Sequence, residues 1–183
     1  MKYIEKYLTI RTPKYYSLQI SKLNDAQKED LERLLEKLEK SGSRDPLSWA
    51  LSEVQENIPQ FARFSMLKGL VEIVDDVEGN IGLSDDVDED YREDIFEIQK
   101  RLIKAISEEE LNAFLKSYTK GVMYQVANLI DEGNAGADNQ PGWVLSEINN
   151  DGDLTGRFIN GLHESLSEFE NELDPEPDDG NDL

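Results

Sequence analysis

Residues 143–148 have the sequence Trp143-Val144-Leu145-Ser146-Glu147-Ile148. They lie near the start of residues 141–172, the segment on which the predicted fold depends most. An earlier segment, Trp49-Ala50-Leu51-Ser52-Glu53-Val54, resembles them at an offset of 94 residues, and Arg157-Phe158 resembles Arg63-Phe64 at the same offset. Six of the 16 positions in this alignment are identical. Self-similarity at a fixed offset indicates a duplicated structural unit. The sequence therefore predicts two similar helical hairpins, each with a buried tryptophan in its first, short helix.

A second match favours a different alignment of the two segments. Residues 69–72 resemble residues 161–164, but the offset is 92 rather than 94. Inside a helix, a difference of two residues rotates all later side chains by about 200°, so only one of the two matches is structurally equivalent. Two unrelated amphipathic hairpins of similar composition are the alternative to a duplication.

Helical spacing of apolar residues continues along most of the chain. After a capping box of Asn24 and Gln27, four leucines follow at the i, i+3, i+4, i+7 spacing of one helix face: Leu31, Leu34, Leu35 and Leu38. Pro46 begins another helix, and Ser107 with Glu110 forms the capping box of the longest one. These signals predict six or seven helices and an all-α fold, either a helical bundle or a two-fold repeated helical array.

The two ends of the chain are predicted differently from its centre. Residues 8–11 and 16–20 are rich in β-formers and flank Pro13, so a small N-terminal β-hairpin is the alternative to a helix there. Residues 173–183 contain five acidic residues and two prolines, which predicts a disordered acidic tail. Residues 1–172 are predicted to form a single helical domain, with residues 1–90 and 91–172 as its repeat halves.

Charge is the strongest compositional signal. The 183 residues carry 19 Lys and Arg against 40 Asp and Glu, a net charge of −21. Residues 1–44 have a net charge of +3, so residues 45–183 carry −24. Such a field repels nucleic acid phosphates and anionic lipids, and it favours basic partners. The sequence has no signal-peptide pattern and no membrane-spanning run, so we expect a cytoplasmic protein, and its negative charge predicts no direct nucleic-acid or membrane binding. It has no cysteine, which excludes disulfides and thiolate metal sites and favours no compartment.

Acidic residues are most concentrated between residues 75 and 90, where Lys and Arg are absent and Gly and Asn also occur. This composition predicts a solvated acidic loop. Its carboxylates have no regular spacing, whereas a metal site needs ligands at defined positions, so the loop is not predicted to bind a metal. These carboxylates are the candidate partner-binding residues: Asp75, Asp76, Asp85, Asp86, Asp88, Glu89 and Asp90.

Residues 147–158 partly resemble the calcium loop of EF-hand proteins. Asn149, Asp151 and Gly152 fall at loop positions 3, 5 and 6, but position 12, where the loop needs a bidentate Glu, is Phe158. Losing those two oxygens predicts at most a weak site, with Asn149, Asp151 and Asp153 as candidate ligands. A turn between two helices is the expected role of this segment, and no metal or other cofactor is predicted.

No catalytic motif is found in the sequence. The one histidine, His163, is not accompanied by a serine elbow, and neither a phosphate-binding loop nor a His-Glu-x-x-His motif occurs. We therefore predict no enzymatic activity and a surface or half-buried position for His163. The pairs Glu53 with Arg63, and Glu147 with Arg157, are each ten residues apart, which favours an ion pair across each predicted hairpin.

These observations favour a non-enzymatic acidic module that binds a basic protein, as an inhibitor or an immunity-type protein does. A DNA-mimic regulator is one alternative, and it requires two rows of carboxylates at the spacing of duplex phosphates. A weak calcium-binding helical module is another. The docking hypothesis requires one concentrated acidic patch, so the arrangement of carboxylates distinguishes it from DNA mimicry.

Overall fold

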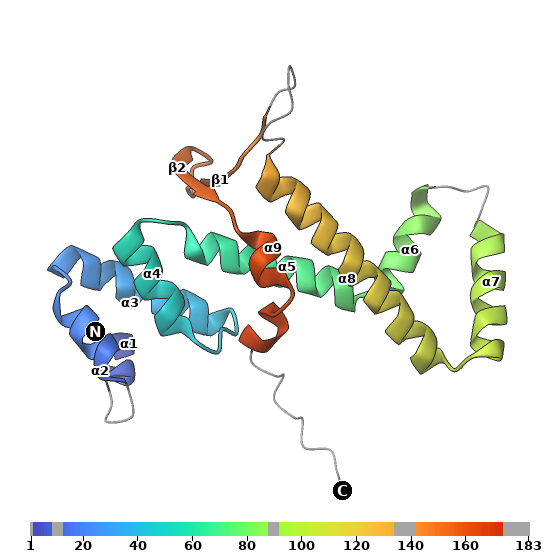
Figure 1. The fold of residues 1–183 in the computed structure, drawn as a ribbon, viewed down its shortest axis with the longest axis horizontal. Coiled ribbons are helices and arrows are strands. Elements are labelled where there is room, and N and C mark those ends of the chain that lie inside the picture. The colour runs from blue at the N-terminus through green and yellow to red at the C-terminus, as the bar shows by residue number, and fades with distance from the viewer. Residues whose placement is uncertain (1, 9–12, 88–91, 134–141, 174–183) are drawn as a thin grey trace, which may run out of the picture.

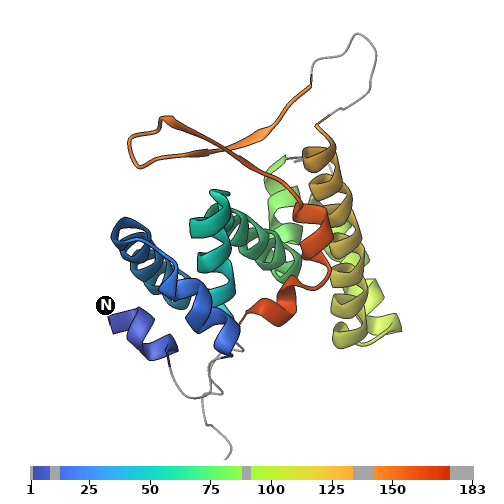
Figure 2. The same cartoon turned by 60° about the vertical axis from the view of Figure 1, so that its left-hand side comes forward.

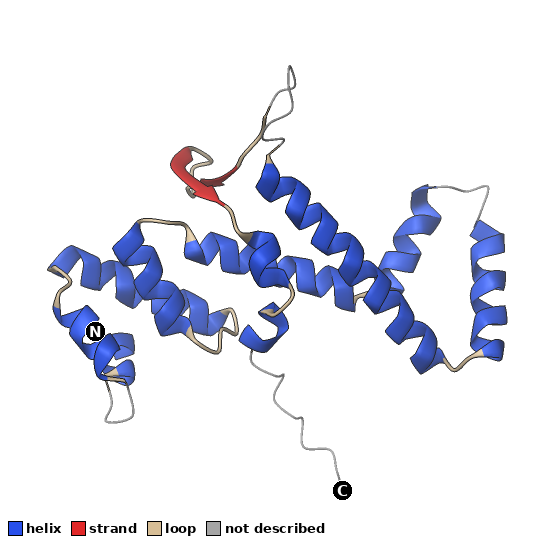
Figure 3. Ribbon diagram, viewed as in Figure 1, coloured by secondary structure: helices blue, strands red, loops and turns tan. Residues whose placement is uncertain are grey.

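The computed structural model describes residues 2–8, 13–87, 92–133 and 142–173 (Figure 1). The helices of this described part are α1 (Lys2–Tyr7), α2 (Lys14–Ser21), α3 (Asp25–Lys40), α4 (Pro46–Glu56), α5 (Gln60–Asp75), α6 (Val77–Val87), α7 (Arg92–Ala105), α8 (Glu108–Glu132) and α9 (Leu162–Leu166). An antiparallel pair of strands, β1 (Leu145–Ile148) and β2 (Leu154–Ile159), and a 3₁₀ helix, η2 (Phe169–Glu172), complete it. Apart from this small sheet the fold is all-α, which confirms the predicted class (Figure 3).

The signals that predicted α3 are confirmed in the structure. The Asn24 side chain accepts a hydrogen bond from the N–H of Gln27 at 2.8 Å, and the Gln27 side chain accepts one from the N–H of Asn24 at 3.0 Å. This capping box provides partners for N–H groups that the start of a helix leaves unpaired. All four leucines of the predicted face are buried in the core, and α3 packs along α4.

α5 is the centre of the packing. It contacts α3, α4, α6, α8, α9, η2 and β2, and Figure 1 shows α8 crossing it diagonally. Phe64 on α5 is fully buried, and its ring makes edge contacts with Trp49 of α4 and Phe169 of η2, at 5.5 and 5.1 Å between centroids. This aromatic cluster joins the C-terminal end of the described chain to its N-terminal half.

The N-terminal residues form two short helices, α1 and α2, rather than a β-hairpin. Glu32 on α3 holds the first of them, because its carboxylate oxygens accept hydrogen bonds from the N–H groups of Tyr3 and Ile4 at 2.8 and 2.9 Å. A carboxylate at a helix N-terminus pairs its free N–H groups and interacts favourably with the helix dipole. Residues 9–12, which include part of the predicted hairpin, lie outside the described residues.

Leu173 packs against the core, so its assignment to a disordered tail is wrong. It forms an isolated β-bridge with Ser43. Next to this bridge, Arg44 donates its backbone N–H to the carbonyl of Glu172 at 2.9 Å and its guanidinium to the carbonyl of Asn171 at 3.1 Å. The rest of the predicted tail, residues 174–183, lies outside the described residues.

The two tryptophan segments do not share one structure, so the predicted duplication of a helical hairpin is wrong. Trp49 belongs to α4 and packs against the core. Residues 145–159 instead form a β-hairpin, with Leu145 opposite Ile159, and Trp143 before it is 43% exposed. Figure 2 shows this hairpin projecting from the helices.

The turn of the hairpin explains why a helix does not form there. The side-chain oxygen of Asn149 accepts hydrogen bonds from the N–H groups of Asp151 and Asp153, both at 2.9 Å. Gly152 has φ +88°, a left-handed conformation that glycine adopts without strain. Such side-chain bonds offer the backbone an alternative to a helix, and they reverse the chain so that the β-formers on either side pair.

Candidate functional site

The segment predicted as an acidic loop is mostly helical in the structure. α5 ends at Asp75 and α6 begins at Val77, so one residue connects them. That residue, Asp76, caps α6, because its carboxylate accepts a hydrogen bond from the N–H of Gly79 at 2.9 Å. Asp is favoured both in loops and at helix starts, where it also interacts well with the dipole. Composition alone therefore could not distinguish the two.

The seven candidate partner-binding residues fall into three groups. Asp75 and Asp76 are exposed at the α5–α6 junction. Asp85 and Asp86 belong to the last turn of α6, where the structure describes the backbone and not their side chains. Asp88, Glu89 and Asp90 lie outside the described residues. The binding role of all seven remains a prediction.

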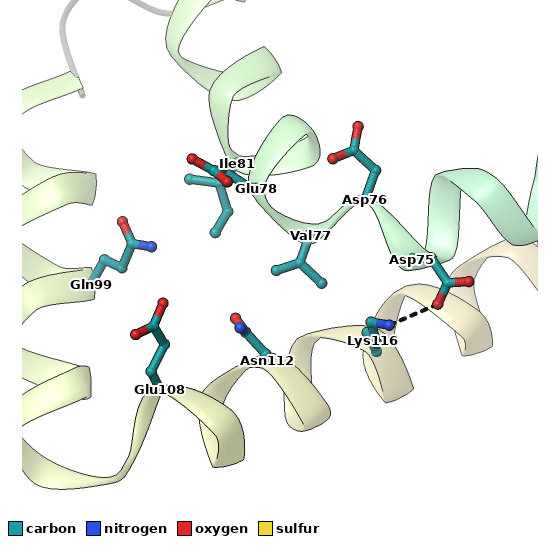
Figure 4. Close-up of a pocket in the computed structure, with 9 residues that line it drawn as sticks. All are labelled: Asp75, Asp76, Val77, Glu78, Ile81, Gln99, Glu108, Asn112 and Lys116. Carbon is teal, nitrogen blue, oxygen red and sulfur yellow. Dashed lines mark hydrogen bonds and ion pairs between the residues drawn. The ribbon is translucent and has the colours of Figure 1, made fainter. Parts of the chain in front are cut away.

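Asp75 and Asp76 line a cleft of about 420 Å³, which we call the acidic cleft (Figure 4). Three helices contribute to it, together with the α5–α6 junction. Its lining residues are Asp75, Asp76, Val77, Glu78 and Ile81 from the junction and α6, Gln99 from α7, and Glu108, Asn112 and Lys116 from α8.

Negative charge predominates in the acidic cleft, because four carboxylates face a single ammonium group among the lining residues. Lys116 pairs with Asp75 at 2.8 Å between Nζ and Oδ1. Both side chains are about half exposed, so we expect this pair to contribute about 0–1 kcal/mol to stability. Asp76, Glu78 and Glu108 have no Lys or Arg partner among the residues that line the cleft.

Glu108 reaches the acidic cleft because Ser107 fixes the start of α8. The Ser107 hydroxyl accepts a hydrogen bond from the N–H of Glu110 at 3.1 Å, and the Glu110 carboxylate accepts one from the N–H of Ser107 at 2.9 Å. The hydrogen bonds that the backbone N–H and the hydroxyl of Ser107 donate to the Glu110 carboxylate lower the pKa of Glu110. The capping box was readable in the sequence, but no signal indicated that α6 would lie opposite it. For this reason Glu78, Glu108 and Lys116 were missed as site residues.

A second group of charged side chains joins the β-hairpin to α4. Arg157 forms two hydrogen bonds with the carboxylate of Glu147, at 2.8 and 2.7 Å, and a third with Glu53 at 2.9 Å. The predicted Glu147–Arg157 pair is thus confirmed. The predicted Glu53–Arg63 pair is wrong, since Glu53 pairs with Arg157, and Arg63 donates to the carbonyl of Gly161 and to Ser165.

This group has the burial expected of a structural element. The Glu53 side chain is 8% exposed, and its second oxygen accepts a hydrogen bond from the N–H of Phe61 at 2.7 Å. Burial opposes the positive charge of Arg157, but hydrogen bonds with Glu147 and Glu53 outweigh it and raise the pKa of Arg157. The network therefore positions the hairpin rather than forming an accessible site.

His163 also has a structural partner. Its Nδ1 lies 2.7 Å from an oxygen of Asp131, which accepts the backbone N–H of His163 as well, at 2.8 Å. The histidine is half-buried, as predicted, and it links α9 to the end of α8. Arg63 donates a hydrogen bond to the hydroxyl of Ser165 at 2.7 Å. Burial lowers the pKa of Arg63, although the negative charges of Glu164 and Asp131 act to raise it.

The candidate calcium ligands lie in the turn of the β-hairpin. Asn149 uses its side-chain oxygen within the turn, and Asp151 and Asp153 are exposed there. Within residues 2–8, 13–87, 92–133 and 142–173, no three or more His, Asp or Glu side chains are grouped so that they could hold a metal ion. The described helices likewise include none that is both long and apolar enough to cross a membrane.

Comparison of the chain with protein-family models, curated proteins and solved structures gave no match.

Proposed function

We propose that this protein is a non-enzymatic module that binds a basic protein partner, and that the acidic cleft is part of the binding surface. The single observation that carries the proposal is the concentration of four carboxylates around one lysine in this cleft. Long-range attraction between such a surface and a cationic partner raises the association rate.

The arrangement of the cleft carboxylates supports docking more than DNA mimicry. A mimic needs two extended rows at the spacing of phosphates, whereas Asp75, Asp76, Glu78 and Glu108 surround one cleft. The carboxylates of residues 85–90 continue the same part of the sequence, so we include them in the proposed binding surface.

A matched pair of charge variants tests the proposal. The cleft variant carries Asp75→Asn, Asp76→Asn, Glu78→Gln and Glu108→Gln. The control variant carries Glu5→Gln, Asp25→Asn, Glu29→Gln and Glu56→Gln, which neutralises four exposed carboxylates far from the cleft. Both variants change the net charge by the same amount, so a difference between them reports position rather than total charge.

Association with a lysine-rich peptide is then measured by stopped-flow fluorescence at about 0.01 M and about 0.15 M salt, where the Debye length falls from about 30 to about 8 Å. We expect the association rate to fall about tenfold with salt, and to fall more in the cleft variant than in the control. Neutralising Asp85, Asp86, Asp88, Glu89 and Asp90 together is expected to lower the association rate more than it changes the dissociation rate. An affinity independent of salt would contradict electrostatic docking.

A further inference from the structure

α8 exposes a row of large apolar side chains on the side that faces away from the core. Phe114, Tyr118, Val122, Val126 and Leu129 follow one another at steps of four or three residues, so they span about 120° of the helix circumference. Phe114 and Tyr118 are each 66% exposed and Leu129 is 57% exposed. On the opposite side, Ala127 is fully buried.

The same side of α8 is covered only at its beginning. Leu111 precedes Leu129 by 18 residues, which is five whole turns, and it is 4% exposed. In Figure 1, α7 and α8 meet at their connection and diverge from there, so α7 does not extend along the rest of the row. The part from Phe114 to Leu129 therefore lacks a neighbouring helix in the described part of the chain.

Trp143 extends the row at its C-terminal end. Its ring N–H donates to the carbonyl of Leu129 at 3.2 Å, and its backbone N–H donates to the carbonyl of Gly133 at 3.1 Å. These bonds fix a tryptophan that is still 43% exposed. Fixed aromatic residues of this kind are enriched among the residues that dominate the energy of protein interfaces. We call Phe114, Tyr118, Val122, Val126, Leu129 and Trp143 the apolar row.

The size of the apolar row suits a bound helix. Phe114 and Leu129 are about 22 Å apart along the axis, which is the length of a helix of about 15 residues. Taking about 150–250 Å² for a whole aromatic side chain and less for Val and Leu, the exposed fractions of the row amount to about 500 Å². An interface of standard size covers about 800 Å² on each partner, so the row supplies more than half of one side.

Charges around the apolar row determine which helix fits. α8 has three acidic residues in its first turn, Glu108, Glu109 and Glu110, and no basic residue in its last turn, which contains Glu132. Lys116 and Lys120 lie on the other side of the helix, where Lys116 pairs with Asp75. A second copy of this chain would place acidic ends against acidic ends, and an anionic membrane would also be repelled. A basic helix meets complementary charge.

We propose that the partner binds as a basic amphipathic helix, with its apolar face on the apolar row and its lysines or arginines near the carboxylates at the two ends of α8, of which Glu108 also lines the acidic cleft. This inference rests on the proposed docking function, and it specifies the structure of the docked segment.

Two labelled peptides of the same leucine and lysine composition test the inference. Each has about 18 residues; in one the leucines follow helical spacing, and in the other they are distributed around the helix. Fluorescence anisotropy measures their binding to the parent protein, to the variant Phe114→Ser with Tyr118→Ser, and to the control Tyr15→Ser with Leu18→Ser. Tyr15 and Leu18 on α2 are 62% and 55% exposed, so the control removes similar side chains elsewhere.

At physiological salt we expect the amphipathic peptide to bind the parent at least about tenfold more tightly than its isomer. The Phe114 and Tyr118 variant is expected to lose this preference, while the Tyr15 and Leu18 control keeps it. Circular dichroism verifies that both variants remain folded, which the exposure of the substituted side chains favours.

Three results would overturn the inference in distinguishable ways. Equal, salt-sensitive binding of both peptides by parent and variant would leave the docking function in place and exclude the apolar row as the helix site. Binding of neither peptide at low salt would contradict the docking function itself. A parent dimer in sedimentation experiments that Phe114→Ser with Tyr118→Ser converts to a monomer would identify a second copy as the occupant.

Discussion

The apolar residues of α3 and α7 follow the same helical spacing, but their surroundings differ. In α3, Leu31, Leu35 and Leu38 are fully buried between α1, α4 and α5. In α7, Ile98 and Leu102 are 45% and 42% exposed, and the helix contacts α8 near their connection. An amphipathic pattern predicts that a helix has an apolar face. It does not predict whether the same chain covers that face.

This contrast extends to the two parts of the molecule that contain these helices. The helices α1–α5, with α9 and η2, contain most of the buried apolar residues, and we call them the packed part. α6, α7 and the first half of α8 form the arm, where Leu111 is the buried apolar residue of the described side chains. Apart from Asp75 and Asp76, which end α5 and connect it to α6, the acidic cleft and the beginning of the apolar row both belong to the arm. The arm therefore has the exposed apolar and acidic surface that a partner would cover.

A matched pair of leucine substitutions tests this contrast most strongly. Leu35→Ala removes a fully buried side chain from α3 and is expected to lower the free energy of unfolding by about 2–5 kcal/mol. Leu102→Ala removes a side chain that is 42% exposed in α7, and we expect a loss below about 1 kcal/mol. Urea denaturation measures both. Equal losses would show that α7 is packed as tightly as α3 in solution.

The two kinds of ion pair differ in the same way. Arg157→Leu leaves the buried carboxylate of Glu53 without its charged partner. Removing one partner of a fully buried ion pair costs about 3–5 kcal/mol. Because a quarter of the Arg157 side chain is exposed, we expect the free energy of unfolding to fall by about 2–3 kcal/mol. Lys116→Met breaks the exposed pair with Asp75 in the arm, and its expected effect is about 0–1 kcal/mol. Thermal unfolding of the two variants measures both effects. A larger loss of stability for Lys116→Met than for Arg157→Leu would contradict the conclusion that the Arg157 pair is buried and the Lys116 pair is exposed.

Acid is expected to weaken the attachment of α1 in the packed part. Burial favours the neutral form of Glu39, but hydrogen bonds with Lys6 and Tyr7 outweigh burial and lower its pKa. A group with a lowered folded pKa contributes stability above its unfolded pKa of about 4.5, and this contribution is lost as the pH falls through the lower folded value. Lys6→Met should therefore cost up to about 1 kcal/mol at pH 6 and progressively less below about pH 4.5.

The control for this prediction is the exposed pair Lys100 and Glu97 in the arm, where a hydrogen bond from Lys100 lowers the pKa of Glu97. Because both side chains are about two-thirds exposed, Lys100→Met is expected to leave the pH dependence of unfolding close to that of the parent. The same titration of unfolding stability compares the two variants with the parent. A Lys6→Met effect that stays constant down to about pH 3 would contradict the role of Glu39.

The smallest effects come from two glycines inside helices. Gly69 in α5 and Gly82 in α6 each have open space where a Cβ would be added. Alanine favours a helix over glycine by about 0.5–1 kcal/mol, so both Gly69→Ala and Gly82→Ala are expected to stabilise their helices. If the arm unfolds separately from the packed part, Gly82→Ala will raise the helical signal in mild urea without moving the main unfolding transition. A shift of the main transition by Gly82→Ala as large as that by Gly69→Ala would show that the two parts unfold together.

Local signals in the sequence determined α3, α4 and α8 correctly. The capping boxes at Asn24 and Ser107 and the leucines of α3 depend on neighbours within four residues, and such contacts are readable from spacing. The pair of Glu147 and Arg157 was also predicted, from their ten-residue spacing across an expected helical hairpin, and in the structure it forms across the β-hairpin instead. For the site, the sequence located Asp75 and Asp76 and the excess of negative charge around them.

The tertiary structure decided what local signals leave open. Similar sequences around Trp49 and Trp143 became a helix and a β-hairpin, because the Asn149 side chain and Gly152 favour a turn and Arg157 finds its third partner on α4, 104 residues away. The acidic cleft likewise needed α6 and α8 to meet, which no spacing within either helix specifies. Composition established that the chain is acidic. Packing alone determined which carboxylates share a cleft and which apolar face of α8 the described part of the chain leaves uncovered, since both depend on contacts between residues distant in sequence.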